Sequence, residues 1–140
     1  MKSSALRTRP TTTGGRARNL ALWALQGLLA VFFAFAGINK FFGLQQEMVD
    51  NFARLGVGVW FRYLVGVLEL VGAIGLLIPR LSGLAAMWLA GVMVGAIFTH
   101  LLFQPPAYYA VVPAVLVLLF VLIARARWPH TRRLLGELLR

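Results

Sequence analysis

The sequence contains no cysteine, only four acidic residues and only two histidines among its 140 positions. The missing cysteines exclude disulfide bonds, thiolate catalysis and cysteine-ligated metals. Charged residues make up 13% of the chain, against about 25% in typical soluble domains. Hydrophobic residues make up 60%, and a soluble domain of this size has too little interior to bury them all. Lipid is therefore the expected solvent for most of the chain.

Basic residues are concentrated towards both ends of the chain. The net charge is +10, and of the 14 Lys and Arg residues five precede Leu20 and five follow Ala124. A protein that binds nucleic acid carries its basic residues as a patch or stripe on a folded surface, and the apolar middle of the chain has no polar surface of that kind. We therefore expect the lipid bilayer, and not nucleic acid, to be the partner.

Four apolar runs are long enough to cross a bilayer, which takes about 20 helical residues. They cover residues 20–42, 60–78, 81–103 and 107–124. Each should be a helix, because a helix satisfies its own backbone polar groups in lipid. Pro79 and Pro105 fall between runs, and Pro113 either kinks the fourth helix or marks its start. The sequence thus predicts an all-α fold, a four-helix transmembrane bundle.

Two shorter segments outside these runs are amphipathic. Residues 45–55 place Met48, Val49, Phe52 and Leu55 on one helical face, and Gly56 is suited to the helix C-terminus. Residues 131–140 place leucines opposite arginines, a pattern typical of a helix lying on a membrane surface. We therefore predict a short interfacial helix between the first two spans. The predicted organisation is a disordered basic tail (1–19), a membrane domain (20–124) and a basic amphipathic tail (125–140).

The positions of Lys and Arg predict the orientation in the membrane. With four spans, both tails and the loop containing Arg80 share one side and carry 11 basic residues, while Lys40, Arg54 and Arg62 lie on the other. Because basic residues stay on the cytoplasmic side, both termini should be cytoplasmic. The expected location is the cell membrane, which in a bacterium is the inner membrane. Ala34 and Ala36 resemble a signal-peptide cleavage site, but the apolar run continues past them, so we expect no cleavage.

Six polar residues lie where the membrane makes them costly, since a charge at bilayer depth costs at least about 2.5–3.5 kcal/mol. They are Asn39, Lys40, Arg62, Glu69, Thr99 and His100. In a four-span topology five of them share a depth band in the outer leaflet, while Arg62 lies two helical turns above Glu69, nearer the membrane surface. Glu69 should face the bundle, with Lys40, Arg62 or His100 as its partner. Two interpretations stay open: a structural ion pair that holds the helices together, or a functional intramembrane site. Because the two histidines fall on opposite sides of the membrane, we expect no metal site.

Gly91 and Gly95 form a GxxxG pattern in the third span. Small residues at this spacing let two membrane helices approach closely. We expect the pattern to mark helix packing within the bundle.

Three stretches of sequence together resemble the DoxX-like family of small four-helix membrane proteins. They are AGINKF (36–41), LGVGVWFRYLVGVLELVGAIGLLIPRLSGLAA (55–86) and THL (99–101). The resemblance covers roughly residues 20–124. It implies that Lys40, Glu69 and His100 are the recurrent polar positions. It also implies a link to quinone-coupled oxidation of sulfur compounds or to redox-stress assemblies, although no catalytic mechanism comes with it.

Three functional hypotheses follow. The first is a small subunit or anchor of a redox-related membrane assembly, with a membrane redox protein or a second copy of the chain as partner and no catalytic activity of its own. The second is a quinone-binding oxidoreductase, in which Glu69 and His100 exchange protons with quinone oxygens. The third is a small-solute transporter or permeation subunit, against which no inverted repeat is visible. Quinone is the one cofactor that these hypotheses name.

Overall fold

The computed structural model describes residues 13–103 and 106–140, and within them every element is a helix. The helices are α1 (Thr13–Phe42), α2 (Gln46–Arg54), α3 (Val59–Leu77), α4 (Ser82–Phe103), the 3₁₀ helix η1 (Ala107–Ala110), α5 (Val111–Ala126) and α6 (Trp128–Leu138). The all-α prediction is confirmed.

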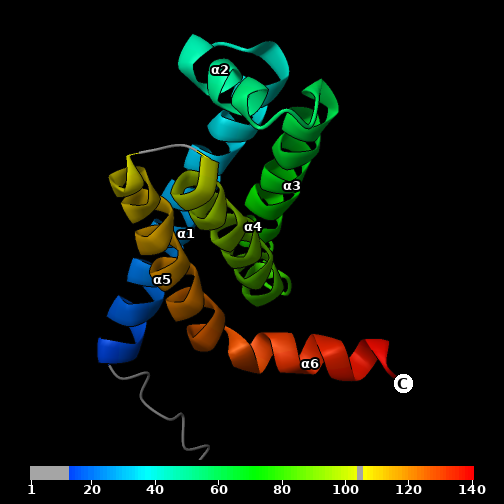
Figure 1. The fold of residues 1–140 in the computed structure, drawn as a ribbon. Coiled ribbons are helices and arrows are strands. Elements are labelled where there is room, and N and C mark those ends of the chain that lie inside the picture. The colour runs from blue at the N-terminus through cyan, green and yellow to red at the C-terminus, as the bar shows by residue number, and fades with distance from the viewer. Residues whose placement is uncertain (1–12, 104–105) are drawn as a thin grey trace, which may run out of the picture.

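Four segments are long and apolar enough to span a membrane, as the sequence predicts. They are Gly15–Phe42, Val59–Leu77, Ser82–Phe103 and Ala107–Ala126. In the bundle α1 packs against α3, α3 against α4, and α4 against α5. Figure 1 shows α2 lying across one end of the bundle and α6 extending sideways from the other. We call these the α2 end and the α6 end.

The bundle core is apolar, and so is most of the surface around it. Phe33 of α1 meets Phe120 of α5 with ring centroids 5.3 Å apart, and Leu76, Leu89 and Ile123 are fully buried beside them. Large apolar side chains such as Leu118 also cover the outside of the helices. A soluble protein rarely exposes apolar patches of this extent, so the outer surface is the one that meets lipid.

Glycines bring the helices into close contact at two places. A Cβ added at Gly37 of α1 would lie 2.8 Å from the carbonyl oxygen of Gly66 in α3, closer than real Cβ atoms approach. A Cβ added at Gly75 of α3 would likewise lie 2.8 Å from the Cβ of Ala85 in α4. The absence of side chains at these points sets the spacing of the three helices.

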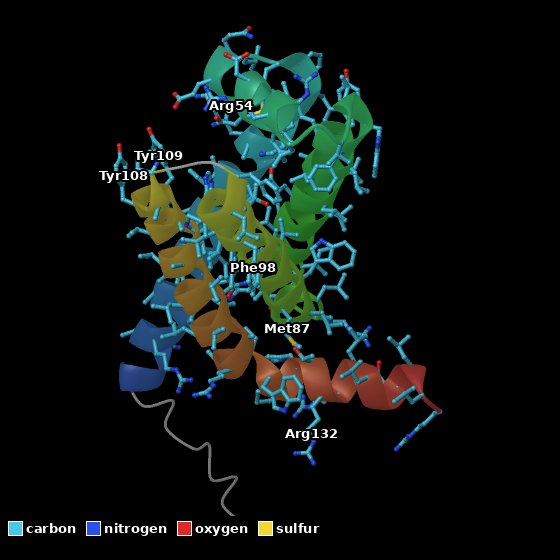
Figure 2. All side chains as sticks on the ribbon, viewed as in Figure 1. Arg54, Met87, Phe98, Tyr108, Tyr109 and Arg132 are labelled. Atoms are coloured by element: carbon cyan, nitrogen blue, oxygen red, sulfur yellow. The ribbon has the colours of Figure 1, made fainter. Side chains whose placement is uncertain are left out.

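The α6 end is closed by α6 packing beneath the start of α4. Thr131 of α6 is fully buried against Gly83 of α4, where any side chain would collide with the threonine hydroxyl. Arg80, in the turn between α3 and α4, forms an exposed ion pair with Glu137 of α6. Figure 2 shows Arg132 of α6 at this end, and Arg54 of α2 together with Tyr108 and Tyr109 at the opposite one.

The structure corrects two of the sequence predictions about helices. Helix α1 begins at Thr13, so residues 13–19 are not disordered as predicted, and residues 1–12 lie outside the described part. The extension has a tertiary contact, because the Asn19 side chain accepts a hydrogen bond from Arg127 at 2.8 Å. Gly91 and Gly95 do not mark helix packing within the bundle either, because no atom of the described residues lies within 4 Å of a Cβ added at either position.

Other local predictions are confirmed. Pro113 lies in the first turn of α5, which begins at Val111, so the proline marks the helix start and not a kink within it. Gly56 follows α2 with a φ of 68°, the left-handed conformation that glycine tolerates at a helix C-terminus.

Candidate functional site

A cavity of about 740 Å³ lies at the α2 end of the bundle. Its walls come from α1, α2, α3, α4 and α5, and are largely apolar, with Phe33, Met93 and Leu116 among them. Gly91 and Gly95 also line it. The absence of side chains at these two positions leaves part of this space open. The GxxxG pattern, which in the sequence suggests helix packing, therefore forms part of the cavity wall in the fold.

An ion pair between α1 and α3 lies in the wall of this cavity. Lys40 Nζ donates a hydrogen bond to Glu69 Oε2 at 2.8 Å, and the two side chains are only 12% and 5% exposed. The aromatic ring of Phe52, from α2, lies 5.9 Å from the Lys40 ammonium. Glu69 therefore faces the bundle, as predicted. The sequence allows Lys40, Arg62 or His100 as the partner of Glu69, and the structure pairs it with Lys40.

The Gly37–Gly66 contact positions this ion pair. Lys40 lies three residues after Gly37 and Glu69 three residues after Gly66, so each charged side chain is about one turn from the point of closest approach. Because the backbones of α1 and α3 nearly touch there, two long side chains meet directly across the interface. A Cβ at Gly66 would lie 3.2 Å from the Cβ of Lys40 itself.

Asn39 holds the turn between α1 and α2. Its Oδ1 accepts a hydrogen bond from the Gln45 backbone N–H at 3.1 Å, and its Nδ2 donates to Gln45 Oε1 at 2.9 Å. Gln45 itself lines the cavity. Asn39 thus fixes the position of α2 above the ion pair and does not join the polar groups on the cavity wall.

Arg62 is also separate from the polar groups on the cavity wall. Its guanidinium stacks over Tyr63 at 5.2 Å from the ring centroid. The sequence places Arg62 on the same helical face as Glu69 but two turns away. At that distance a local cation–π contact forms instead of a pair with the carboxylate.

Thr99 and His100 of α4 both line the cavity. The Thr99 hydroxyl donates to the Gly95 carbonyl in its own helix at 2.9 Å. His100 Nδ1 is buried and, within residues 13–103 and 106–140, has no hydrogen-bond partner. The rings of His100 and Tyr109 have centroids 6.2 Å apart. The cavity wall therefore carries the Lys40–Glu69 pair, the Glu47 carboxylate of α2 and the buried Nδ1 atom of His100.

A second polar cluster, at the α6 end, is not among the sequence predictions. Arg127 Nε donates to Gln26 Oε1 at 2.9 Å, and Gln26 Nε2 donates to the Leu76 carbonyl at 2.8 Å. Arg127 also lies 5.1 Å from the centroid of Trp23. The signal available in the sequence is Gln26 itself, a polar residue one turn and a half inside an apolar run. We call Asn19, Gln26, Arg127 and the Leu76 carbonyl the Gln26–Arg127 cluster.

Metal binding is not indicated at either end. In the described part of the chain, no three His, Cys, Asp or Glu side chains gather as a metal site would require.

Comparison with known proteins gives one match. A family model for the DoxX-like family matches residues 24–123, which include the second and third spans, most of the first and fourth, and the whole cavity wall. No curated protein and no solved structure matches the chain.

Proposed function

The chain belongs to the DoxX-like family, and from this premise we propose that the cavity at the α2 end binds a ligand of the quinone class. The supporting observation is the cavity itself, about 740 Å³ of mainly apolar space with the Lys40–Glu69 pair and His100 in its wall. Ligand pockets in proteins are typically about 300–1,000 Å³ and combine apolar walls with a few convergent polar groups. The size and lining fit an amphipathic molecule with a polar ring and an apolar tail.

The polar residues have distinct roles in this proposal. Lys40 has donor capacity beyond its bond to Glu69, since an ammonium carries three donors, and it can donate to a ring oxygen. His100 presents an imidazole nitrogen that can accept or donate a hydrogen bond to a ring oxygen. Glu69 keeps the Lys40 ammonium in place and balances its charge. A quinone would supply two-electron, two-proton chemistry, and its electrons would come from a membrane redox protein.

The substitution Glu69→Gln tests the proposal. It keeps a hydrogen-bond acceptor but removes the charge that fixes Lys40, so we expect the affinity for a short-chain ubiquinone to fall about tenfold, equal to about 1.4 kcal/mol. Binding would be measured by isothermal titration calorimetry with the detergent-solubilised protein. Glu137→Gln is the matched control, because Glu137 is an exposed carboxylate at the α6 end. The affinity of this variant for the ubiquinone should equal that of the unmodified protein.

Two results would contradict the quinone proposal. One is the absence of ubiquinone binding by the folded, unmodified protein. The other is equal affinity in Glu69→Gln and Glu137→Gln.

A second candidate function is a subunit or anchor of a redox-related membrane assembly. Helix α6 favours it, because it lies outside the match to the family and extends from the bundle with Leu138 and the adjoining Leu139 exposed. Mass spectrometry of the gently solubilised protein separates the two candidates. A stoichiometric quinone that is lost in Glu69→Gln supports the first, and a reproducible partner protein without quinone supports the second. The transporter hypothesis is tested by solute flux in liposomes.

We also propose that the α6 end, with both termini, faces the cytoplasm of a bacterial cell. The support is the excess of basic residues at that end, 11 against three. The cysteine-free sequence allows a direct test with single cysteines at two exposed positions, Val57 and Leu139. In intact spheroplasts a membrane-impermeant maleimide should label Val57→Cys fully and Leu139→Cys only after permeabilisation. The reverse pattern would invert the orientation.

A further inference from the structure

A groove of about 620 Å³ runs between α1 and α5 at the α6 end, on the side of the molecule that faces lipid. Leu22 and Leu25 of α1 form one wall, and Leu118, Val121 and Leu122 of α5 form the other. Arg18 and Arg125 lie in the same lining. Their positions near the first turns of α1 and in the last turn of α5 put both arginines where the apolar spans end. The groove therefore combines an apolar trough with two cations at its membrane-surface end.

These cations have no carboxylate to neutralise them. The chain has four acidic residues: Glu69 is paired with Lys40, Glu137 with Arg80, and Glu47 and Asp50 belong to α2 at the opposite end. Arg18 and Arg125 are therefore cations without an acidic partner at this end of the bundle. The groove thus has an excess of charge of one sign beside a lipid-facing apolar wall.

Arg127, which directly follows Ala126 of the groove lining in the chain, adds to this excess. It is 92% buried, since its exposed fraction is 8%, and its Nη2 atom has no hydrogen-bond partner in the described part of the chain. Burial lowers the pKa of Arg127, and the positive charge of Arg18 lowers it further, which places Arg18 within electrostatic range of it. Three arginines at one end of two helices would therefore be stabilised by an anion, and no residue of the described chain provides one.

We infer that this groove is a binding site for an anionic phospholipid, with an acyl chain along the leucines and the phosphate headgroup at Arg18 and Arg125. The chemistry of the site matches each part of such a lipid, because basic residues between transmembrane helices bind anionic headgroups and the exposed leucines and valine contact hydrocarbon. The occupant is an anionic diacyl lipid because a zwitterionic lipid would leave the arginine charges without compensation. The inference does not depend on the cavity at the α2 end or on its ligand.

Native mass spectrometry of the detergent-solubilised protein tests the inference. Phosphatidylglycerol and phosphatidylcholine with identical acyl chains would be added at equal concentration. We expect a single bound phosphatidylglycerol to be retained about tenfold more often than a single phosphatidylcholine, because each arginine near the headgroup attracts the anionic phosphate. In the double variant Arg18→Gln/Arg125→Gln this preference should fall to about twofold or less.

The matched control is Arg132→Gln/Arg133→Gln, which removes the same charge from exposed positions on α6, outside the groove. This control should keep the full preference for phosphatidylglycerol. The inference would be overturned by equal retention of the two lipids, or by an equal loss of preference in the two double variants. The second result would mean that the net charge of this end, and not the groove, attracts the lipid. Circular dichroism would establish that each variant is folded.

Discussion

Replacing Lys40 with methionine should lower the free energy of unfolding by about 3–5 kcal/mol, the usual effect of removing one partner of a buried ion pair. The Glu69 side chain is 5% exposed and its carboxylate bonds directly to Lys40. Methionine fills the space of the lysine stem but offers no donor, so the carboxylate stays buried without a partner. The measurement is unfolding of the protein in mixed micelles at increasing denaturing-detergent fraction, followed by circular dichroism.

Two further variants identify the cause of this loss. The double variant Lys40→Met/Glu69→Leu should recover most of the stability, because replacing both members of a buried ion pair with apolar residues is often neutral or stabilising. Arg54→Met, which removes an exposed cation from α2, should change the stability by about 0.5 kcal/mol or less. If Lys40→Met were as stable as Arg54→Met, the ion pair would contribute nothing to the fold.

Replacing Gln26 with leucine should lower the free energy of unfolding by about 2–4 kcal/mol, since each unsatisfied buried polar group costs about 1–3 kcal/mol. Gln26 is fully buried and makes two hydrogen bonds, one to the Leu76 carbonyl and one from Arg127. The Leu76 carbonyl lies in the last turn of α3, where no backbone N–H of the helix reaches it. The variant therefore leaves both a carbonyl and part of a guanidinium without a partner.

The comparison variant for Gln26→Leu is Gln46→Leu. Gln46 also makes a side-chain hydrogen bond, to Asp50, but both residues are exposed on α2, so water replaces the lost bond. Hydrogen exchange followed by mass spectrometry adds a local measurement. In Gln26→Leu the end of α3 should exchange faster, whereas α2 should not change. Equal stability of the two glutamine variants would contradict the role assigned to the Gln26–Arg127 cluster.

The spans were predictable because a bilayer imposes a length and a composition on every helix that crosses it. Each predicted run coincides with a described helix to within a few residues, except at the start of α1. There the composition of residues 13–19 indicates solvent, but the hydrogen bond from Arg127 to Asn19 comes from a residue more than 100 positions away. Sequence patterns within a single helix carry no information about such a partner.

The site was predictable in part, for a geometric reason. Position along a span gives the depth of a residue, and on that basis Lys40 and Glu69 share a level. Depth does not give the direction in which a side chain points relative to neighbouring helices. Asn39 shares the level of the pair but bonds within the α1–α2 turn, and Arg62 shares the helical face of Glu69 but contacts Tyr63. The open space beside Gly91 and Gly95 was not predictable, because glycines suit a tight contact and a cavity equally well. Whether the candidate residues act in binding stays a prediction.

The Gln26–Arg127 contact has a consequence for the timing of assembly during translation. The two residues are 101 positions apart, and ribosomes add about 5–20 residues each second. About 5–20 seconds therefore separate the synthesis of Gln26 from that of Arg127. During this interval Gln26 can already bond to the end of α3, but its oxygen has no arginine donor. The residue that follows the fourth span thus completes the polar bonding of the first, and a chain that stops before Arg127 leaves this bond unmade.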